Sequence, residues 1–465
     1  MPHKRFFVTL RRVTIQTHKE INQSTKQRTM KKILTFILLM TCASMASADN
    51  WPDGTKIDKW FADTSKVDVK SLGRQYVITD YGVKDDSTIV QTMQLQAVID
   101  KAANEGGGVI VIPRGTFLSG SLFFKPKTHL HIAEGGKLKG SDRITNYKIV
   151  ETRIEGETCM YFSALVNADH ADGFTITGKG TIDGNGYNYW DEFWIRRKWN
   201  RKCTNKDAQR PRLIYISNSS NVTVQDVHIM NSAFWTNHVY NSDHVRYLDC
   251  YIYAPTSGMK APSSDAIDID KCHDFLINGC YMNVNDDAVV LKGGKGTYAD
   301  TMSVNGPVER VLIQNCHYGT AHSMLTLGSE SLHDRNIILR NCTSDNTTRV
   351  LWLKMRPDTP QQYEYVMVDG VKGKTKSFLF VHPWSQFFNP QKRDNMPESF
   401  CRHIIIKNIS MDCKNFFDVV DKNDKYDLCD FTFENIKVTD EDDTFDPQVI
   451  DGTKVKNVVI NGRRF

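Results

Sequence analysis

The sequence has no hydrophobic run long enough to span a bilayer. Its longest apolar run, residues 33–40, follows Lys31 and Lys32 and precedes small residues that end at Ala48. This pattern is typical of a secretory signal peptide that starts at Met30, and the run is too short for a stable membrane anchor. We therefore expect residues 1–48 to be a leader and the protein to be exported to the periplasm, the cell surface or the medium.

The chain after this leader also lacks an excess of basic residues. The leader carries nine Lys and Arg residues and one Glu, so the remainder has a formal net charge of −3, against +5 for the whole sequence. Without a basic patch, a nucleic-acid partner is excluded. Cys42 follows Leu39-Met40-Thr41, which resembles a degenerate lipobox, so lipid attachment at Cys42 stays open.

The ten cysteines after the leader lack the arrangement of a disulfide framework. Four of them follow the same kind of strand-like run, in RYLDC, LINGC, LIQNC and ILRNC. Free cysteine packs like a small apolar residue, and equivalent positions of successive repeats lie above one another. Although an exported protein permits disulfides, we expect a buried, reduced column of Cys250, Cys280, Cys316 and Cys342.

Helical periodicity is scarce. Only residues 91–103 place Leu95, Val98 and Ile99 at helical spacing, and the glycines at 106–108 end that helix. No Lys-Ser or Lys-Thr pair follows the glycines, so they indicate a turn rather than a phosphate-binding loop. Beyond them, short alternating runs at 109–112, 116–118, 122–124 and 130–132 predict strands.

From about residue 213, a repeat of one short strand and one polar residue takes over. The polar residue falls at Asp226, Asp249, Asn278, Asn315, Asn341, Asn408, Asn435 and Asn461. A unit of this size cannot bury its own apolar side and must stack on its neighbours. We therefore predict an all-β fold, a right-handed parallel β-helix whose coils lie about 4.8 Å apart. Asn at one turn favours left-handed backbone and amide ladders along the stack.

This repeat sets the expected domain organisation. We predict an N-terminal arm at 49–75 and a single β-helix domain at 76–465, and we expect a monomer. The open ends of a solenoid invite edge pairing, so the helix at 91–103 is the expected N-terminal cap. The long interval between Asn341 and Asn408 is expected to hold one ordinary coil, YEYVMVDG, and a projecting loop at 381–399.

Three acids in the stretch 263–292 carry the candidate chemistry. Asp265 lies 21 positions before Asp286, and Asp287 follows directly. One turn of a coil would bring these carboxyl groups together. Glycoside hydrolysis needs such a set, with an acid for the leaving oxygen and carboxylates that activate water or attack directly. The structural alternative is that aspartates at coil corners cap turns, and we expect that role for Asp268 and Asp270.

Further along the chain, His322 is expected one coil beyond the acid pair, where an imidazole can relay a proton or tune the pKa of the acids. In RVLWLKMRP, strand alternation puts Trp352, Lys354 and Arg356 on one face. These cations would bind an anionic or polyhydroxylated sugar. A surface histidine and a solvated charged edge are the alternatives.

The chain resembles the polygalacturonase family, glycoside hydrolase family 28, in four motifs that occur in the family's order. They are Ser263-Ser264-Asp265, Asp286-Asp287, Gly319-Thr320-Ala321-His322-Ser323 and Trp352-Leu353-Lys354, where the family has Asn-Thr-Asp, Asp-Asp, Gly-His-Gly and Arg-Ile-Lys. The N-terminal segment that begins ITDYGVKDD, GTIDGNG (180–186) and NSAFWTNH (231–238) also resemble the family. The resemblance runs from about residue 76 to the C-terminus.

The resemblance implies an inverting hydrolase of pectic polysaccharides or oligosaccharides that uses no cofactor or metal. Asp286 would be the general acid, and Asp265 and Asp287 would hold the water. His322 would support the acid, and Lys354 would bind sugar. From NSAFWTNH we add Trp235 and His238 as candidate substrate-binding residues, and Trp384 from the loop VHPWSQFFNP (381–390).

Trp352 replaces the arginine that binds the galacturonate carboxylate in the resembled family. An indole offers an apolar face for a sugar ring, so we favour rhamnogalacturonan-type pectin over plain polygalacturonan. Arg349 or Arg356 would compensate for the missing guanidinium. Aromatic residues at 188–194 and 381–390 would wall one end of the cleft and favour exo action. The alternatives are a Ca²⁺-dependent polysaccharide lyase and a non-catalytic glycan-binding β-helix.

Overall fold

The computed structural model describes residues 50–386, 391–420 and 426–465. The predicted leader at 1–48 lies outside the described residues, as do Phe387 and Phe388 of the predicted cleft wall. In the part of the chain that is described, no helix has the length and apolar character needed to cross a membrane.

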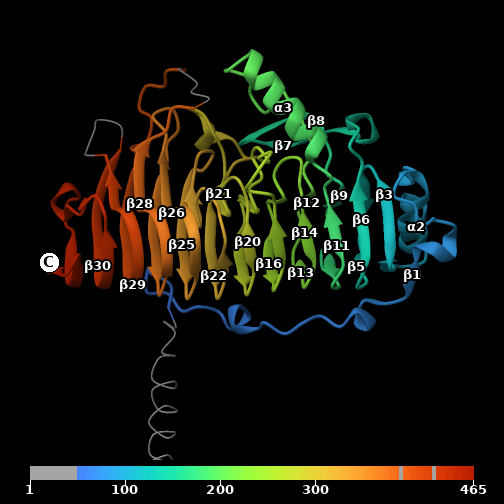
Figure 1. Ribbon diagram of the computed structural model, residues 1–465, viewed down its shortest axis with the longest axis horizontal. Helices are drawn as coiled ribbons and strands as arrows, with labels where there is room; N and C mark the ends of the chain where they lie inside the picture. Colours follow the sequence, from blue (N-terminus) through green and yellow to red (C-terminus); the bar gives the residue numbers. More distant parts are fainter. Residues whose placement is uncertain (1–49, 387–390, 421–425) are drawn as a thin grey trace, which may run out of the picture. The chain divides into compact units, whose positions relative to one another are not determined.

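The strands wind into a right-handed parallel β-helix, as the repeat predicts. Figure 1 shows its coils side by side in chain order, from α2 (Thr92–Asn104) at one end to β30 (Asp427–Asp440) at the other. Apart from one antiparallel hairpin and the short β32 (Arg463–Arg464), the described strands pair in parallel with strands one coil away, so the coils form three stacks. The stack that carries the candidate site contains β4 (Leu122–Phe124), β9 (Val166–Asp169), β12 (Ile214–Ser217), β15 (Asn237–Tyr240), β18 (Ile267–Asp270), β21 (Val289–Lys292), β24 (Leu325–Leu327), β26 (Thr343–Met355) and β28 (Lys372–Pro383).

Two further stacks complete each coil. The second contains β1 (Gln75–Val77), β2 (Gly108–Ile112), β5 (Thr128–Ile132), β10 (Thr175–Thr177), β13 (Thr223–Gln225), β16 (Asp243–Leu248), β19 (His273–Asn278), β22 (Val308–Gln314), β25 (His333–Arg340), β27 (Gln362–Asp369), β29 (Phe400–Val419), β30 and β31 (Lys454–Ile460). The third contains β3 (Gly115–Ser119), β6 (Gly136–Gly140), β11 (Thr181–Asp183), β14 (His228–Met230), β17 (Tyr251–Tyr253), β20 (Tyr281–Asn283) and β23 (His317–Tyr318). Long strands such as β29 run round a corner and join the stacks.

The interior of the coils is packed by apolar residues in rows along the axis. Ile269 pairs in register with Leu291, and Leu291 with Leu327, and all three are fully buried. Each such side chain contacts its counterparts one coil away, which is why a single repeat cannot be stable alone. The predicted coil YEYVMVDG is confirmed as β27.

The polar position of the repeat adopts left-handed backbone in seven of its eight predicted places, with φ between 51° and 62°. At the remaining place Gly279, at φ 70°, takes that conformation instead of Asn278. The predicted amide ladder is present, since the side-chain amide of Asn315 donates to Asn278 (2.9 Å). One assignment is wrong: Asn457, not Asn461, donates to Asn435, because Val458 pairs with Ile436.

The predicted helix is confirmed as α2, which buries Leu95, Val98 and Ile99. It contacts β2, β4 and β5, and its role as a cap stays a prediction. A second helix, α3 (Tyr187–Trp199), was not predicted. It buries Tyr189, Trp190 and Phe193 but exposes Trp194 and Trp199, so its apolar residues do not mark one face.

An antiparallel hairpin of β7 (Ile149–Ile154) and β8 (Glu157–Phe162) leaves the coil before β9. Its strand β7 is held by Arg153, which forms a buried ion pair with Asp270 of β18 (3.1 Å). Its tip is packed closely against two later coils, because a Cβ added at Gly156 would lie 3.0 Å from side-chain atoms of Lys295 and Glu330. The hairpin therefore spans several coils.

The segment before β1 runs along the coils, as Figure 1 shows in blue. It contains two 3₁₀ turns, Lys59–Ala62 and Val69–Leu72. Asp53 accepts a hydrogen bond from Asn336 (2.8 Å), and Lys66 pairs with Asp226 (2.9 Å). This segment thus links coils that are far apart in sequence.

All ten cysteines of the described chain are free, and the predicted column of Cys250, Cys280, Cys316 and Cys342 is buried. Their thiols donate to backbone carbonyl groups, for example Cys250 to Val224 (3.4 Å). The expectation of reduced structural cysteines is confirmed.

Candidate active site

The candidate catalytic residues lie where the strands of the first stack begin. Asp265 precedes β18, Asp286 and Asp287 precede β21, and His322 precedes β24. The register pairs Ile267 with Val289, so the counterpart of Asp265 on the next coil is Asp287, 22 positions on. The spacing of 21 therefore joins Asp265 to Asp286, which is the residue next to its register partner Asp287. The adjacent acids Asp286 and Asp287 both reach the site from one coil.

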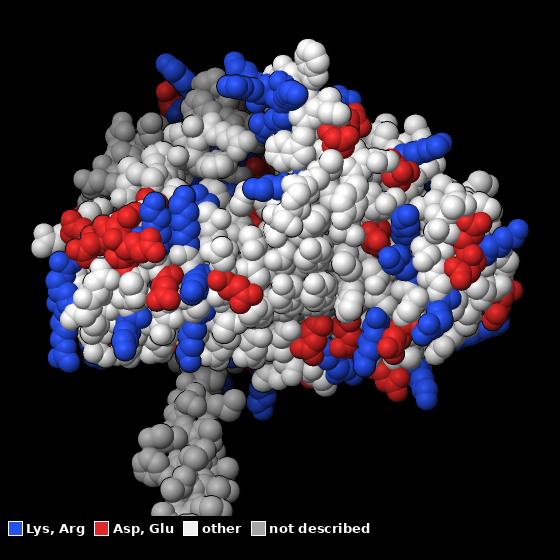
Figure 2. All heavy atoms as spheres, viewed as in Figure 1, with Lys and Arg blue, Asp and Glu red and all other residues white. Residues whose placement is uncertain are grey.

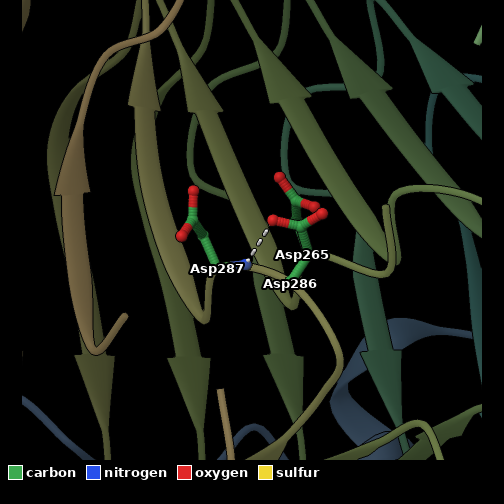
Figure 3. Close-up of side chains that lie close together, drawn as sticks. All are labelled: Asp265, Asp286 and Asp287. Carbon is green, nitrogen blue, oxygen red and sulfur yellow. Dashed lines mark hydrogen bonds between the residues drawn. The ribbon is translucent and has the colours of Figure 1, made fainter. Parts of the chain in front are cut away.

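Figure 3 shows the three carboxyl groups on the same side of the sheet. One oxygen from each of Asp265, Asp286 and Asp287 lies within 4.8 Å of the others. Asp287 accepts hydrogen bonds from Lys354 Nζ (2.8 Å) and Ser323 Oγ (3.0 Å). These three acids could hold a cation, but the ammonium group of Lys354 already faces one of them.

Asp286 is half-buried and contacts the exposed ring of His322, whose Nδ1 lies 3.2 Å from Oδ1 of Asp286. Burial raises the pKa of Asp286, but His322 and Lys354 outweigh burial and lower it to about 2. Burial lowers the pKa of His322, but Asp286 and Asp287 outweigh burial and raise it above its usual value. An ionised Asp286 therefore lies beside an imidazole that binds a proton readily.

Asp265 is in a different environment. It is 5% exposed, and its Oδ1 has no hydrogen-bond partner among the described residues. Burial raises the pKa of Asp265 well above its usual value, and the charges of Asp286 and Asp268 raise it further. Crowded carboxyl groups cannot all ionise, and the buried one holds the proton most readily. The site therefore combines a proton on Asp265 with charge on Asp286.

A cleft of about 650 Å³ opens above these acids. Of the residues predicted from the sequence, it is lined by Asp265, Asp286, Asp287, His322, Lys354, Trp352, Trp235 and Trp384. Phe193 and Trp194 of α3, from the stretch 188–194 that is predicted to wall the cleft, also line it. The structure adds Arg197 from α3, Glu155 from the hairpin, Lys292 and Glu330. Figure 2 shows Lys and Arg side chains gathered on and beside α3, whose last turn carries Arg196, Arg197 and Lys198.

Two predicted substrate-binding residues are not brought to the cleft. Arg356 is buried and forms a two-pronged pair with Asp358, at 2.7 Å for each contact. His238 is fully buried between Asp270 (3.3 Å) and Arg212 (2.7 Å). Both side chains already use their hydrogen-bonding groups within the protein, so neither has one to offer to a sugar.

Trp352 lines the cleft, but its ring faces other side chains. Arg349 and Lys354 lie over the ring, 3.8 Å and 4.0 Å from its centroid, and Trp384 contacts it edge-on. Only 6% of Trp352 is exposed. The expected open indole face for a sugar ring is therefore absent.

Asp268 and Asp270, which we expect to be structural, lie beneath the acids. Asp270 pairs with Arg153, and Asp268 lies 3.5 Å from Lys292, which also pairs with Glu330 (3.1 Å). Burial raises the pKa of Asp268 to about 8, although Lys292 acts against it. Sequence reasoning missed Lys292. Its position could have been inferred from strand alternation, which puts Lys292 on the same face of β21 as Val290, two residues earlier.

The sequence model for glycosyl hydrolases family 28 matches residues 109–361. The chain belongs to this family. Among relatives in family 28, a probable polygalacturonase of Vitis vinifera is 26% identical over 263 residues, which are 54% of this chain and 51% of that protein. The exo-poly-alpha-D-galacturonosidase of Dickeya chrysanthemi is 24% identical over 341 residues, with 63% and 54% covered. The chain spans about half the length of these two relatives.

A solved structure of the family 28 fold is similar over most of the chain. It is the hyperthermoactive exopolygalacturonase of Thermotoga maritima, with a TM-score of 0.69 and 22% identity. The match covers 84% of this chain and 93% of that one. At this identity the likeness concerns the fold, and it agrees with the β-helix described above.

Proposed function

We propose that this protein is a pectin-degrading glycoside hydrolase that cleaves galacturonate-containing chains by acid–base catalysis. The observation that carries the proposal is the cluster of Asp265, Asp286 and Asp287 at the floor of a cleft, with His322 in contact with Asp286. Glycoside hydrolysis requires one carboxyl group that delivers a proton and another that stays ionised. The names of the relatives, a polygalacturonase and an exo-poly-alpha-D-galacturonosidase, support a pectic substrate.

In this mechanism Asp286 protonates the leaving oxygen while the bond from that oxygen to the anomeric carbon breaks. Water held by Asp265 and Asp287 adds to the anomeric carbon and gives its proton to Asp287, which faces Lys354. Because the pKa of Asp286 is about 2 in the free site, the acid must first receive a proton. His322, 3.2 Å away and partly open to solvent, is the donor within reach.

The stereochemical outcome is the finer part of this proposal. Inverting enzymes usually separate the two carboxyl groups by about 6.5–9.5 Å and retaining ones by about 5–5.5 Å. Here the closest oxygens lie within 4.8 Å. We propose inversion, with three carboxyl groups around one water, and NMR of the first product decides it. A retained anomer would remove the water-holding role of Asp265 and Asp287.

Exo action is a second finer proposal. The cleft runs from Trp235, before β15, to Trp384, after β28. Five coil steps of about 4.8 Å separate these strands, roughly 24 Å in all. Side chains of α3 and residues after β28 contribute to the lining, which leaves room for a short oligosaccharide. Release of single sugars from the end of a chain, seen as product size over time, is the expected result.

The acid role is tested with Asp286→Asn and two substrates. Hydrolysis of a pectic oligosaccharide is expected to fall by about 10²–10⁴-fold, because the leaving oxygen is no longer protonated. An aryl galacturonide with an acidic phenol as leaving group needs no such proton and should keep most of its rate. Asp345→Asn, at an exposed pair with His317, is the control. Equal losses on both substrates would assign the acid role elsewhere.

Preference for rhamnogalacturonan over polygalacturonan stays a prediction. Its original reason, an open indole at Trp352, is weakened because cations cover the ring. Initial rates on the two polymers and on their oligosaccharides test it. A higher kcat/KM on rhamnogalacturonan is the outcome that supports the preference.

A further inference from the structure

Lys292, the last residue of β21, is a buried cation shared by several carboxyl groups beneath the catalytic acids. Its Nζ lies 3.1 Å from Oε2 of Glu330 and 3.5 Å from Oδ1 of Asp268. Its side chain is 4% exposed, and Nζ lies 4.2 Å from the ring centroid of Trp235. Burial lowers the pKa of Lys292, but Glu330, Asp268 and Asp265 outweigh burial and raise it well above its usual value. Lys292 is therefore a fixed positive charge in a site closed to water.

Asp268 connects this charge to the catalytic residue Asp265. Asp268 is fully buried, and neither of its carboxyl oxygens has a hydrogen-bond partner among the described residues. The same holds for Oδ1 of Asp265, although Asp265 also lines the cleft. The charge of Asp268 raises the pKa of Asp265. Buried acceptors without a donor are costly, so a proton held between Asp265 and Asp268 is favoured, and the pair titrates as a unit.

The cluster has more carboxyl groups than cations. Asp265, Asp268 and Glu330 all act on the one ammonium group of Lys292. The charged groups nearest Glu330 are otherwise Lys295, Arg356 and Glu155. Near the other members lie Arg212, Tyr247, His238, Asp286 and Asp287. Crowded carboxyl groups cannot all ionise, and those beside the ammonium group ionise first. The charges therefore belong on Glu330 and Asp268, and the proton on Asp265.

We propose that Lys292 is a positioning residue for the attacking water: it keeps Asp268 ionised, so that Asp265 directs its proton inward and accepts from the water with its outer oxygen. This inference rests on the proposed hydrolase function and adds a residue to the same site. A carboxyl group whose proton is held on one oxygen keeps the other as an acceptor. Asp265 retains this proton throughout, and the proton released by the water goes to Asp287.

The proposal fixes the sign of two shifts in the pH profile of kcat. Hydrolysis requires one negative charge on the pair of Asp265 and Asp268, so the acid limb follows the loss of the pair's first proton. Lys292→Met holds that proton more tightly and should move the acid limb up by about one pH unit, a tenfold loss of kcat on that limb. Glu330→Gln leaves the charge of Lys292 unshared and should move the limb down. The alkaline limb, which depends on His322, should stay.

Two further variants separate charge from packing. Lys292→Arg keeps the positive charge and should keep the acid limb where it is. Lys456→Met removes an exposed pair with Glu434 (2.7 Å) and is the control that should shift nothing. Thermal unfolding of each variant tests folding, and Glu330→Gln carries the test if Lys292→Met does not fold. A loss of rate without a shift of the acid limb, or an upward shift in Glu330→Gln, would overturn the proposal.

Carbon-13 NMR of protein labelled at the aspartate carboxyl carbon measures the pair without turnover. Signals that disappear in Asp265→Asn and in Asp268→Asn assign the two residues. The titration of Asp268 should move to higher pH in Lys292→Met and to lower pH in Glu330→Gln. Unshifted titrations would overturn the role of Lys292 and leave the hydrolase proposal standing. Shifted titrations in a protein that hydrolyses no pectic substrate would overturn the hydrolase proposal and, with it, the role of Lys292 in holding water.

Discussion

Asp265 and Asp286 have the same side chain, but their pKa values are shifted in opposite directions because their surroundings differ. Asp286 meets His322, whereas Asp265 is buried with one oxygen unpartnered. Sequence motifs could name both residues, because the four motifs occur in order. They could not assign the proton, because that depends on burial and on which neighbour each carboxyl group faces.

The coupling between Asp286 and His322 predicts a pH dependence. The raised pKa of His322 keeps its ring protonated to higher pH, so proton delivery is present below that pKa and is lost as the pH rises through it. NMR titration of His322 should give a lower pKa in Asp286→Asn than in the unmodified protein, because the carboxylate that raises it is gone. An unchanged titration would break the proposed link.

Replacement of Trp352 should reduce the selectivity for substrates that carry carboxyl groups, and not the stacking of a sugar ring. Trp352→Ala removes the surface on which Arg349 and Lys354 lie. The ratio of kcat/KM between oligogalacturonate and its carboxyl-reduced form should fall several-fold, because Arg349, the remaining candidate for the missing guanidinium, is no longer oriented. Trp352→Phe keeps a ring and should restore much of the ratio. A uniform loss on both substrates would instead indicate general damage to the cleft.

At the scale of elements, the hairpin β7–β8 and helix α3 contribute to the walls of the cleft. The aromatic residues at 188–194 are predicted to lie there, but neither the helix nor the hairpin is. Their positions follow from contacts distant in sequence. Arg153 lies 117 residues from Asp270, and Trp194 donates to the backbone of Lys260, 66 residues away. Periodicity within a window of residues carries no information on such pairs. The strands were predictable because each strand has the same kind of neighbour one coil away, so their pattern repeats along the sequence.

The buried pair of Arg153 and Asp270 predicts a stability change. Arg153→Met should lower the free energy of unfolding by about 3–5 kcal/mol, because a buried carboxylate loses its partner. Burial raises the pKa of Asp270, but Arg153 and His238 outweigh it and lower the pKa below its usual value. The stabilisation is therefore present above the pKa of the unfolded chain and is lost as the pH falls through the folded value. Urea unfolding at neutral and acidic pH measures both effects.

Arg310→Met serves as the comparison for this experiment, since its pair with Asp274 is partly exposed. Its cost should be about 1 kcal/mol or less. Similar losses of unfolding free energy in Arg153→Met and Arg310→Met would contradict the larger contribution expected from the buried pair of Arg153 and Asp270.

At the scale of the whole molecule, the β-helix was predictable because each coil repeats the same requirements. A left-handed turn and an interior apolar row recur from coil to coil, and a buried cysteine follows the turn in four successive coils. The last coil was misassigned because NVVINGRRF carries two asparagines, Asn457 and Asn461, and both adopt positive φ. Only the pairing of Val458 with Ile436 distinguishes them.

Because each coil contacts only its neighbouring coils, the effect of a substitution in the core should stay local. Leu339→Ala in β25 removes a fully buried side chain that lies in register with Ile313 and Val368. It should cost about 2–5 kcal/mol. Hydrogen exchange should accelerate in β22, β25 and β27 more than in β2 and β5, because contacts reach one coil at a time. Uniform acceleration along the chain would indicate a fully cooperative unit instead.

The contacts of the arm before β1 can form only late in synthesis of the chain. Asp53 contacts Asn336, 283 residues later in the chain, so the first described segment cannot complete its contacts until the coil of β25 exists. At about 5–20 residues per second, a ribosome needs roughly 15–60 s to make the intervening chain. During that interval the coils made earlier lack the contacts of the arm. The contact between Asp53 and Asn336 can form only after the coils that carry Asp265, Asp286 and His322 have been made.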